Sequence, residues 1–388
     1  MGGTVTTDIF QGANPGLSFT LPGETWIIGF GIQVVSQQTN GVFSDQIGSA
    51  LINNGNIYGY FSGVSFLGSG GAITNNAGHN IVGGGAGIFL GANGETVTNL
   101  GTVMGTGGYG VQFGFNSNDV VLNNSGEVYG LDGGVYAGSS SEGGIILNSG
   151  LIRSDFDGIR VDTAAGLSTT IDNFAAGTIT GFSLAIHTIS GAISLNNSGT
   201  VQGAILYQAP NANDTVRNSG KINGELFLGQ GNDTFNGAGG TSGEVNGEAG
   251  NDTLIGGNSG DTLNGDSGND TIRGGRGKDS LFGGPDADIF DFNSIKDSLP
   301  GSKRDVIQDF QRGSDTIDLE GIDAKTGVSG NQKFNWIGKS DFHDKKGELR
   351  YEDKGATVIV QGDTNGDGKA DFEILVKVAA LGKGDFLL

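Results

Sequence analysis

The sequence predicts an all-β protein in which short strands stack as a long solenoid. Three observations support this fold class. A divergent repeat of 21 to 25 residues, marked by asparagine and glycine, occupies residues 51–224. A nine-residue repeat rich in glycine and aspartate follows it, and the 76 glycines of the chain fall at regular spacings. Regular spacing is typical of stacked repeats, whereas irregular glycine is typical of disorder.

Charge and composition limit the possible partners. The chain of 388 residues carries 42 acidic and 21 basic residues, and its formal charge is -21. This excess disfavours nucleic acid and anionic lipid and favours divalent cations. Only Arg153 and Arg160 precede residue 201 among the basic residues, and the chain contains no cysteine, which excludes disulfides and thiolate metal sites.

Neither a membrane helix nor an N-terminal signal is expected. No uninterrupted apolar stretch reaches the roughly 18 residues of a transmembrane helix. The first residues, MGGTVTTDIFQG, lack the basic start and apolar centre of a secretory signal. We therefore expect any export signal to lie elsewhere in the chain.

The asparagine repeats predict a right-handed parallel β-helix over residues 51–227. In each repeat, short strands such as GIFLG and GVQFG alternate apolar and polar residues, so alternate side chains enter a narrow core. Residues 1–50 fit less well and are expected to form an N-terminal cap or the first turns. The repeats are marked by Asn54, Asn76, Asn99, Asn124, Asn148, Asn173, Asn197 and Asn218, with spacings of 22, 23, 25, 24, 25, 24 and 21 residues. We expect an interior or turn ladder of amides, with a catalytic or ligand role as the alternative.

The nine-residue repeat occupies residues 228–291. Its copies begin at Leu228, Gly247, Gly256, Gly265, Gly274 and Gly283, and each has Asp at the sixth position and an apolar residue at the eighth. A glycine-rich turn presents carbonyl oxygens, the sixth residue adds a carboxylate, and the last three residues form a strand. Calcium takes six to eight oxygen ligands, and stacked turns offer oxygens from two layers. The repeat therefore predicts several bound calcium ions.

This nonapeptide resembles the repeat of the RTX (repeats-in-toxin) family. The resemblance implies a parallel β-roll in which two nonapeptides make one turn. It implies calcium ligands at Asp233, Asp252, Asp261, Asp270, Asp279 and Asp288. It also places Gly247, Gly250, Gly265, Gly268, Gly274, Gly277, Asn251 and Asn269 in the metal-binding turns.

Some copies depart from the pattern. Ser259 and Asp286 take the fourth position, where glycine is usual, and Gly243 stands where an Asp is expected, after an insertion at Gly237. These changes weaken the prediction for Asp233. Aspartates in glycine-rich turns without metal are the alternative interpretation.

Residues 292–388 are expected to form a different, β-rich unit. The segments ADIFDF, RDVIQDFQRGSDTIDLEGIDA and GELRYEDKGATVIVQGDTNGDGKADFEILVKV make residues 287–388 similar to the C-terminal domain of serralysin metalloproteases and related type I secreted proteins. The resemblance implies a cap on the β-roll, export by a type I secretion apparatus, and an uncleaved signal at Asp385-Phe386-Leu387-Leu388. It stops there, because His79, His187 and His343 are isolated and no HExxH zinc motif is present.

Two segments leave alternatives open. DTNGDGKADFE, Asp363–Glu373, matches an EF-hand loop except that Ile374 takes the twelfth position, and a polar hairpin turn explains it as well. SDFDGIRVDT brings together Asp155, Asp157, Arg160 and Asp162. This cluster is structural if Asp157 caps a turn and Arg160 pairs with Asp162 in solvent, and catalytic if the β-helix is an enzyme.

The sequence favours a secreted, extracellular or cell-surface calcium-binding protein with a structural or adhesive role. A cell-surface polysaccharide or further copies of the chain are the candidate partners. We expect no enzyme activity; a β-helix polysaccharide lyase or epimerase is the alternative, because that fold supports many chemistries. A pore-forming toxin is disfavoured, since it requires a long apolar or amphipathic helical region.

Overall fold

The computed structural model describes residues 2–114, 117–139 and 144–388. This part of the chain is all-β, as predicted: it contains strands and two 3-10 helices, η1 (Gly301–Lys303) and η2 (Lys383–Asp385). None of its helices is long and apolar enough to cross a membrane. The chain forms two compact units, the first made of residues 1–212 and 220–224 and the second of residues 213–219 and 225–388.

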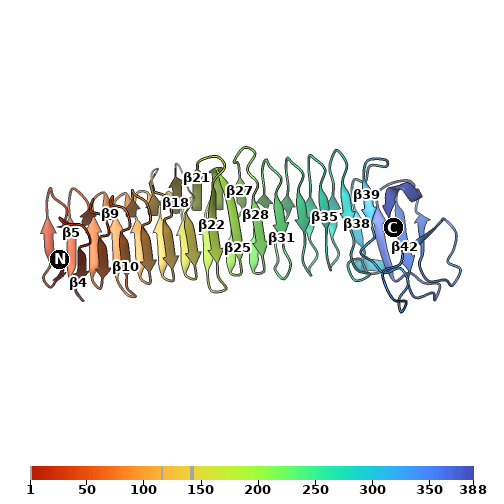
Figure 1. Ribbon diagram of the computed structural model, residues 1–388, viewed down its shortest axis with the longest axis horizontal. Coiled ribbons are helices and arrows are strands. Elements are labelled where there is room, and N and C mark those ends of the chain that lie inside the picture. The colour runs from red at the N-terminus through yellow and green to blue at the C-terminus, as the bar shows by residue number, and fades with distance from the viewer. Residues whose placement is uncertain (1, 115–116, 140–143) are drawn as a thin grey trace. The chain divides into compact units, whose positions relative to one another are not determined.

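The first unit is a parallel β-helix with three strands per turn (Figure 1). One sheet contains β1 (Gly3–Val5), β4 (Thr25–Ile28), β7 (Ala50–Asn53), β10 (Ala72–Asn75), β13 (Thr96–Asn99), β16 (Val121–Asn124), β19 (Ile145–Asn148), β22 (Ser168–Asn173) and β25 (Ala192–Asn197). The second contains β2 (Ile9–Gln11), β5 (Gln33–Ser36), β8 (Asn56–Gly59), β11 (Asn80–Gly83), β14 (Thr102–Gly105), β17 (Glu127–Gly130), β20 (Leu151–Ser154), β23 (Thr178–Gly181), β26 (Thr200–Gln202) and β29 (Lys221–Asn223). The third contains β3 (Leu17–Ser18), β6 (Val42–Ser44), β9 (Ser62–Phe66), β12 (Ala86–Leu90), β15 (Tyr109–Phe113), β18 (Gly133–Ser139), β21 (Asp157–Thr163), β24 (Leu184–Ser190) and β27 (Ile205–Tyr207).

Aliphatic ladders fill the interior of this unit. Leu51, Ile73, Val97, Leu122 and Ile146 stack in register from turn to turn, and each is fully or almost fully buried. Strand alternation explains this, because the side chains between them point outward. Residues 3–44, which fitted the repeat poorly, supply strands to the same three sheets.

An asparagine ladder runs beside the aliphatic core. Each side-chain Nδ2 donates to the Oδ1 of the asparagine one turn later, at 2.8 or 2.9 Å. Its members are Asn53, Asn75, Asn99, Asn124, Asn148, Asn173 and Asn197, and all are buried. The predicted interior ladder is therefore confirmed, but two markers were wrong. Asn54 and Asn76 form a separate partly buried pair, because the buried apolar residue that sets the alternation is Leu51 in one turn and Ile73 in the next.

The second unit has two strands per turn where the nonapeptides lie. One sheet contains β28 (Thr215–Asn218), β31 (Thr234–Asn236), β33 (Thr253–Ile255), β35 (Thr271–Arg273), β37 (Ile289–Asp291), β39 (Thr316–Asp318) and β44 (Phe386–Leu387). The other contains β30 (Leu226–Phe227), β32 (Val245–Asn246), β34 (Thr262–Asn264), β36 (Ser280–Phe282) and β38 (Asp305–Ile307). Paired strands such as β33 and β35 are 18 residues apart, so two nonapeptides make one turn, as the RTX resemblance implied.

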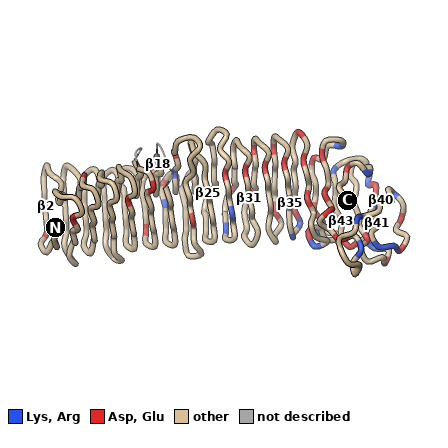
Figure 2. Tube along the Cα trace, in the orientation of Figure 1, with Lys and Arg blue, Asp and Glu red and all other residues tan. Residues whose placement is uncertain are grey.

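Antiparallel strands follow the roll within the second unit. β43 (Phe372–Val376) pairs in parallel with β38 and antiparallel with β42 (Val358–Asp363). β42 pairs antiparallel with β41 (Glu348–Asp353), and β41 pairs in parallel with β40 (Asn335–Gly338). Charged residues are sparse in the first unit, whereas acidic residues recur on successive turns of the second (Figure 2).

Candidate metal centre

The six predicted aspartates lie at equivalent positions in the second unit. Each directly precedes a three-residue strand and is buried, with 1 to 7% of its surface exposed. They form two columns, one containing Asp233, Asp252, Asp270 and Asp288 and the other containing Asp261 and Asp279. The nonapeptide period therefore aligns carboxylates along both sides of the roll.

Backbone hydrogen bonds hold one oxygen of each carboxylate. The N–H of Asp252 donates to Oδ1 of Asp270 at 2.7 Å, and the N–H of Asp270 donates to Oδ1 of Asp288 at 2.9 Å. The second column repeats the arrangement, since the N–H of Asp261 donates to Oδ1 of Asp279 at 2.8 Å. Each carboxylate is thus fixed by the aspartate of the preceding turn.

The other carboxylate oxygen has no hydrogen-bond partner in most of these residues. This is true, within the described residues, of Oδ2 in Asp233, Asp252, Asp270, Asp279, Asp288 and Asp305. Asp261 differs, because its Oδ2 accepts the N–H of Gly257 at 2.7 Å. A buried carboxylate oxygen without a donor is costly, so a row of them indicates that a cation belongs beside it.

Burial raises the pKa of these carboxyl groups, because desolvation disfavours the charged form. The pKa is raised to about 6 for Asp252 and Asp270 and to about 7 for Asp279 and Asp288. Neighbouring carboxylates add to the effect at Asp270 and Asp279, and the backbone N–H bond opposes it. Without a counter-ion, these carboxyl groups therefore bind protons at a higher pH than exposed aspartates do.

The predicted glycines make room around the unpaired oxygens. A Cβ placed on Gly247, Gly265 or Gly274 would collide with Oδ2 of the aspartate five residues later. The same hypothetical Cβ on Gly247 would lie 2.7 Å from the carbonyl oxygen of Gly265. The first glycine of the repeat therefore leaves a small space bordered by a carboxylate oxygen and a carbonyl oxygen of the next turn.

The fourth position of the repeat explains the remaining glycines. Gly250, Gly268 and Gly277 have φ values of 139°, 125° and 145°, a region that side chains rarely adopt. Asp286 takes this position with φ of 85°, so the departure is accommodated as a strained non-glycine residue. Asn251 and Asn269 have exposed side chains whose Oδ1 atoms accept backbone N–H groups of the next turn.

Three further aspartates continue the columns, and the sequence analysis missed them. The N–H of Asp279 donates to Oδ1 of Asp305, that of Asp288 to Oδ1 of Asp315, and that of Asp214 to Oδ1 of Asp233. A shorter motif identifies two of them, because Asp-Thr followed by an apolar residue recurs at Asp214 and Asp315 as it does at Asp252. Asp305 carries only the weaker pattern Asp-Val-Ile.

Side chains alone do not complete a metal site. No group of three or more His, Cys, Asp or Glu side chains placed to hold an ion occurs in the described residues. Each turn contributes one carboxylate per column, so further ligands must be carbonyl oxygens of the glycine-rich turns. Calcium accepts such carbonyls readily, and this donor set fits it.

The segment that resembles an EF-hand loop is a hairpin turn between β42 and β43. Both oxygens of Asp363 accept backbone N–H groups of the turn, from Gly366 at 2.6 Å and Gly368 at 2.9 Å. Asp371 accepts the N–H and the hydroxyl of Thr364. These carboxylates have donors, unlike the unpaired oxygens of the roll.

Comparison with known proteins bears on the second unit. Residues 226–388 match the family model described as peptidase M10 serralysin C terminal. The match to the serralysin C-terminal family includes the nonapeptides as well as the strands after them, so it begins earlier than the resemblance noticed from residue 287. It spans less than half of the chain.

A search of curated proteins finds no match. Among solved structures, one similar chain is the AlgE6R3 subunit of the Azotobacter vinelandii mannuronan C5-epimerase, determined in solution. It is 22% identical, with 45% of this chain and 77% of that chain covered, and the TM-score is 0.22. A likeness this weak carries no argument about fold or activity.

The acidic cluster of the first unit differs from its structural interpretation. Asp157 does not cap a turn; its Oδ2 lies 2.9 Å from Nδ1 of His187. Asp162 bonds to the hydroxyl of Ser190 at 2.7 Å and forms no ion pair with Arg160 in the part of the chain described. His187 is therefore not isolated: strand pairing places it beside Arg160, which the distance along the sequence concealed.

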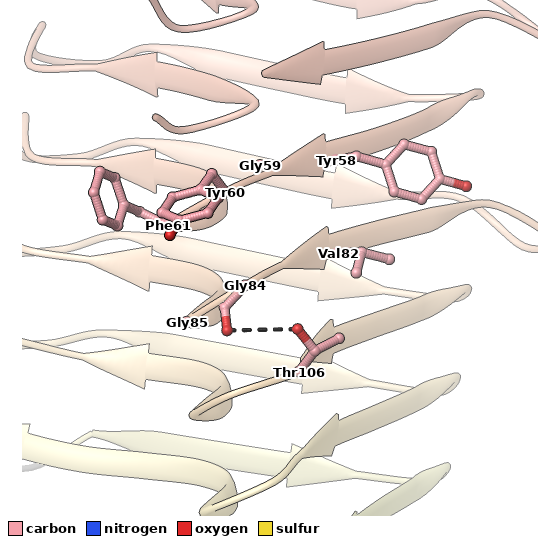
Figure 3. Close-up of a pocket in the computed structure, with 8 residues that line it drawn as sticks. All are labelled: Tyr58, Gly59, Tyr60, Phe61, Val82, Gly84, Gly85 and Thr106. Carbon is pink, nitrogen blue, oxygen red and sulfur yellow. Dashed lines mark hydrogen bonds between the residues drawn. The ribbon is translucent and has the colours of Figure 1, made fainter. Parts of the chain in front are cut away.

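A groove on the first unit, away from this cluster, is aromatic and uncharged. Tyr58 and Val82 project from neighbouring strands, and Tyr60 and Phe61, which directly follow the strand of Tyr58, meet edge to face with ring centroids 5.1 Å apart (Figure 3). Thr106 donates to the carbonyl oxygens of Gly83 and Gly84 at its edge. The groove offers stacking surface without acid, base or metal ligand.

Proposed function

We propose that the second unit is a calcium-binding β-roll and that the protein is exported and completes its folding on calcium outside the cell. The observation that carries this proposal is the row of buried aspartates in which every member except Asp261 has one carboxylate oxygen lacking a donor. A protein folds around such a row only if a cation or protons neutralise it. Extracellular calcium is the cation suited to carboxylate and carbonyl oxygens.

The aspartates Asp252, Asp270, Asp279 and Asp288 are the proposed carboxylate ligands, with Asp233 and Asp261 at the margin of the site. Asp233 lacks a complete neighbouring repeat, and one Asp261 oxygen already accepts a backbone N–H. Gly247, Gly250, Gly265, Gly268, Gly274 and Gly277 supply space and carbonyl oxygens in this proposal. Asn251 and Asn269 contribute main-chain atoms, because their side chains bond to the next turn.

Calcium stoichiometry tests the site. We expect Asp270→Asn and Asp279→Asn each to lower the number of calcium ions bound at saturation, measured by equilibrium dialysis. Asp286→Asn is the matched control, since Asp286 lies in the same roll with an exposed side chain. Unchanged stoichiometry in both test variants would contradict the proposal.

Export by a type I apparatus is the second part of the proposal, and the serralysin C-terminal match supports it. The terminal residues predicted to carry the signal form β44, which pairs with β39, while Asp385 bonds to Arg312 at 3.2 Å. Secretion of the full chain should be compared with that of a chain ending at Gly384, in a host that has the transporter. Undiminished secretion of the shorter chain would rule out the terminal signal.

A structural or adhesive role is the function we propose for the exported protein. The first unit presents a long, nearly uncharged surface, and within its described residues the clustered ionisable side chains gather mainly around β17 to β24. The domain limits at residues 50, 227 and 291 remain predictions.

A further inference from the structure

A groove on the outer face of the third sheet of the first unit collects unlike functional groups. Tyr109, Asp132, Phe156, Asp157, Arg160 and His187 line it, and they come from consecutive turns of the β-helix. Strand pairing sets Tyr136 beside Arg160 and Arg160 beside His187. Neighbouring parallel strands lie about 4.8 Å apart, so these side chains form one continuous surface.

Arg160 is the cation without a partner in this groove. No ion pair or hydrogen bond of its guanidinium occurs in the described residues, and its Nε is buried without an acceptor. The positive charge of Arg160 acts to lower the pKa of Tyr109, Tyr136 and His187. In the strand register Arg160 lies between Tyr136 and His187. A guanidinium in this state is suited to a carboxylate, which accepts two parallel N–H bonds.

Arg153 shows how the same residue type is satisfied elsewhere in this unit. Its Nε lies 2.5 Å from Oε1 of Glu127, and its guanidinium lies 4.3 Å from the ring centroid of Tyr129. These are the only two basic residues before residue 201. The unpaired state of Arg160 is therefore a local property of the groove.

His187 is the second basic group of the groove. Nδ1 contacts the Asp157 carboxylate at 2.9 Å, and Nε2 contacts Oε1 of Gln208 at 3.2 Å. The carboxylate at Nδ1 favours a proton on that nitrogen, whereas the Gln208 amide has both an acceptor oxygen and a donor nitrogen to offer Nε2. The hydrogen bond to Asp157 raises the pKa of His187, and the positive charge of Arg160 lowers it.

Aromatic rings complete the groove. The rings of Tyr109 and Tyr136 are tilted by 33° with centroids 4.9 Å apart, and Phe156 is 55% exposed. An exposed aromatic surface beside the Arg160 guanidinium offers a packing face for the C–H side of a sugar ring. A ligand that uses every feature has a ring and a carboxylate.

We propose that this groove binds a hexuronate residue of an acidic polysaccharide, with its carboxylate on Arg160 and its ring against Tyr109 and Phe156. Arg160 is the specificity-determining residue. Asp157 holds His187 and Asp132 lines the same groove, so Arg160 is the group that must pair with the ligand carboxylate. The site lies entirely in the first unit and does not depend on the proposed calcium function of the second.

Titration calorimetry on the full chain at fixed calcium tests the proposal. The probes are short hexuronate oligomers and neutral glucose oligomers of equal length. We expect measurable binding of the uronates alone, weakened at least about tenfold by Arg160→Gln through loss of the charge-assisted pair. Arg153→Gln is the matched control and should change the affinity by less than about twofold.

Two further measurements keep the result decisive. Far-ultraviolet circular dichroism establishes that Arg160→Gln is folded, and His187→Gln serves as a second variant if it is not. Equal binding by wild type and Arg160→Gln, or equal binding of neutral and acidic oligomers, would overturn the proposal. Ultraviolet absorbance of unsaturated uronate, followed in the same samples, detects turnover; turnover lost in Arg160→Gln but kept in Arg153→Gln would support the same site.

Discussion

Both units bury a column of polar side chains, but they satisfy the hydrogen-bonding groups of that column differently. In the first, Asn124 donates to Asn148 and accepts from Asn99, so each amide satisfies the next. In the second, Asp270 accepts a backbone N–H on one oxygen and has no donor for the other. An amide carries both donor and acceptor, whereas a carboxylate carries only acceptors. An asparagine column is therefore complete by itself, whereas an aspartate column leaves oxygens that only a cation or a proton can satisfy.

Calcium removal should produce the largest effect and separate the two units. In chelator, residues 247–291 should lose protection from hydrogen exchange, because three-residue strands bury too little apolar surface to offset buried charge and glycine ordering. Residues 51–197 should remain protected. Equal protection of residues 247–291 with and without chelator would contradict the comparison.

Breaking the asparagine column should cost less but be independent of calcium. Asn124→Ala removes the two hydrogen bonds to Asn99 and Asn148 and two more to backbone carbonyl oxygens, so we expect a loss of about 2–4 kcal/mol in unfolding free energy. Asn123→Ala is the control on the same strand, where the side chain points outward. Its cost should stay within about 0.5 kcal/mol in urea unfolding of the calcium-loaded protein.

The pH dependence of the second unit should reverse between chelator and calcium. The folded pKa values of about 6 at Asp270 and about 7 at Asp279 exceed the ordinary value of 3.8. At pH values between the ordinary pKa and the raised pKa, the folded state binds more protons than the unfolded chain. The free energy of unfolding in chelator therefore rises as the pH falls from 8 toward 5. With calcium the trend is opposite, because protons compete for the same oxygens. Exchange protection measured across this range, with and without chelator, tests the reversal; the same trend in both series would contradict it.

The sequence predicted the architecture well because repeat spacing is a strictly local signal. The β-helix and the aligned aspartates follow from periods that a single chain displays, and the turn of two nonapeptides was implied by the resemblance to the RTX repeat. The sequence did not show which of two adjacent asparagines points inward, nor which residues far apart in the chain become neighbours. Asn54 and Asn76 were chosen over Asn53 and Asn75 because adjacent asparagines are distinguished only by which one shares the parity of the buried residue. The contact between Asp157 and His187 spans 30 residues, and strand register alone creates it.

The assignment of Asn75, in place of Asn76, to the buried column predicts the smallest effect. Asn75 is fully buried in the column, whereas Asn76 lies partly exposed and bonds only to Asn54 among the interactions described for its side chain. Asn76→Ala should cost less than about 1 kcal/mol and Asn75→Ala about as much as Asn124→Ala. Thermal unfolding of the two variants side by side measures this, and equal losses would restore the original assignment.

The asparagine column also constrains how this molecule can change length. A turn whose asparagine bonds to both neighbours can be duplicated or deleted as a block, because the column closes again wherever two asparagines meet one turn apart. An insertion of a few residues at a corner leaves the column intact, while a shift of one residue within a strand breaks it. One turn is thus the repeat unit: whole turns are interchangeable at the level of gene segments, and the length of the β-helix is adjustable in steps of one turn.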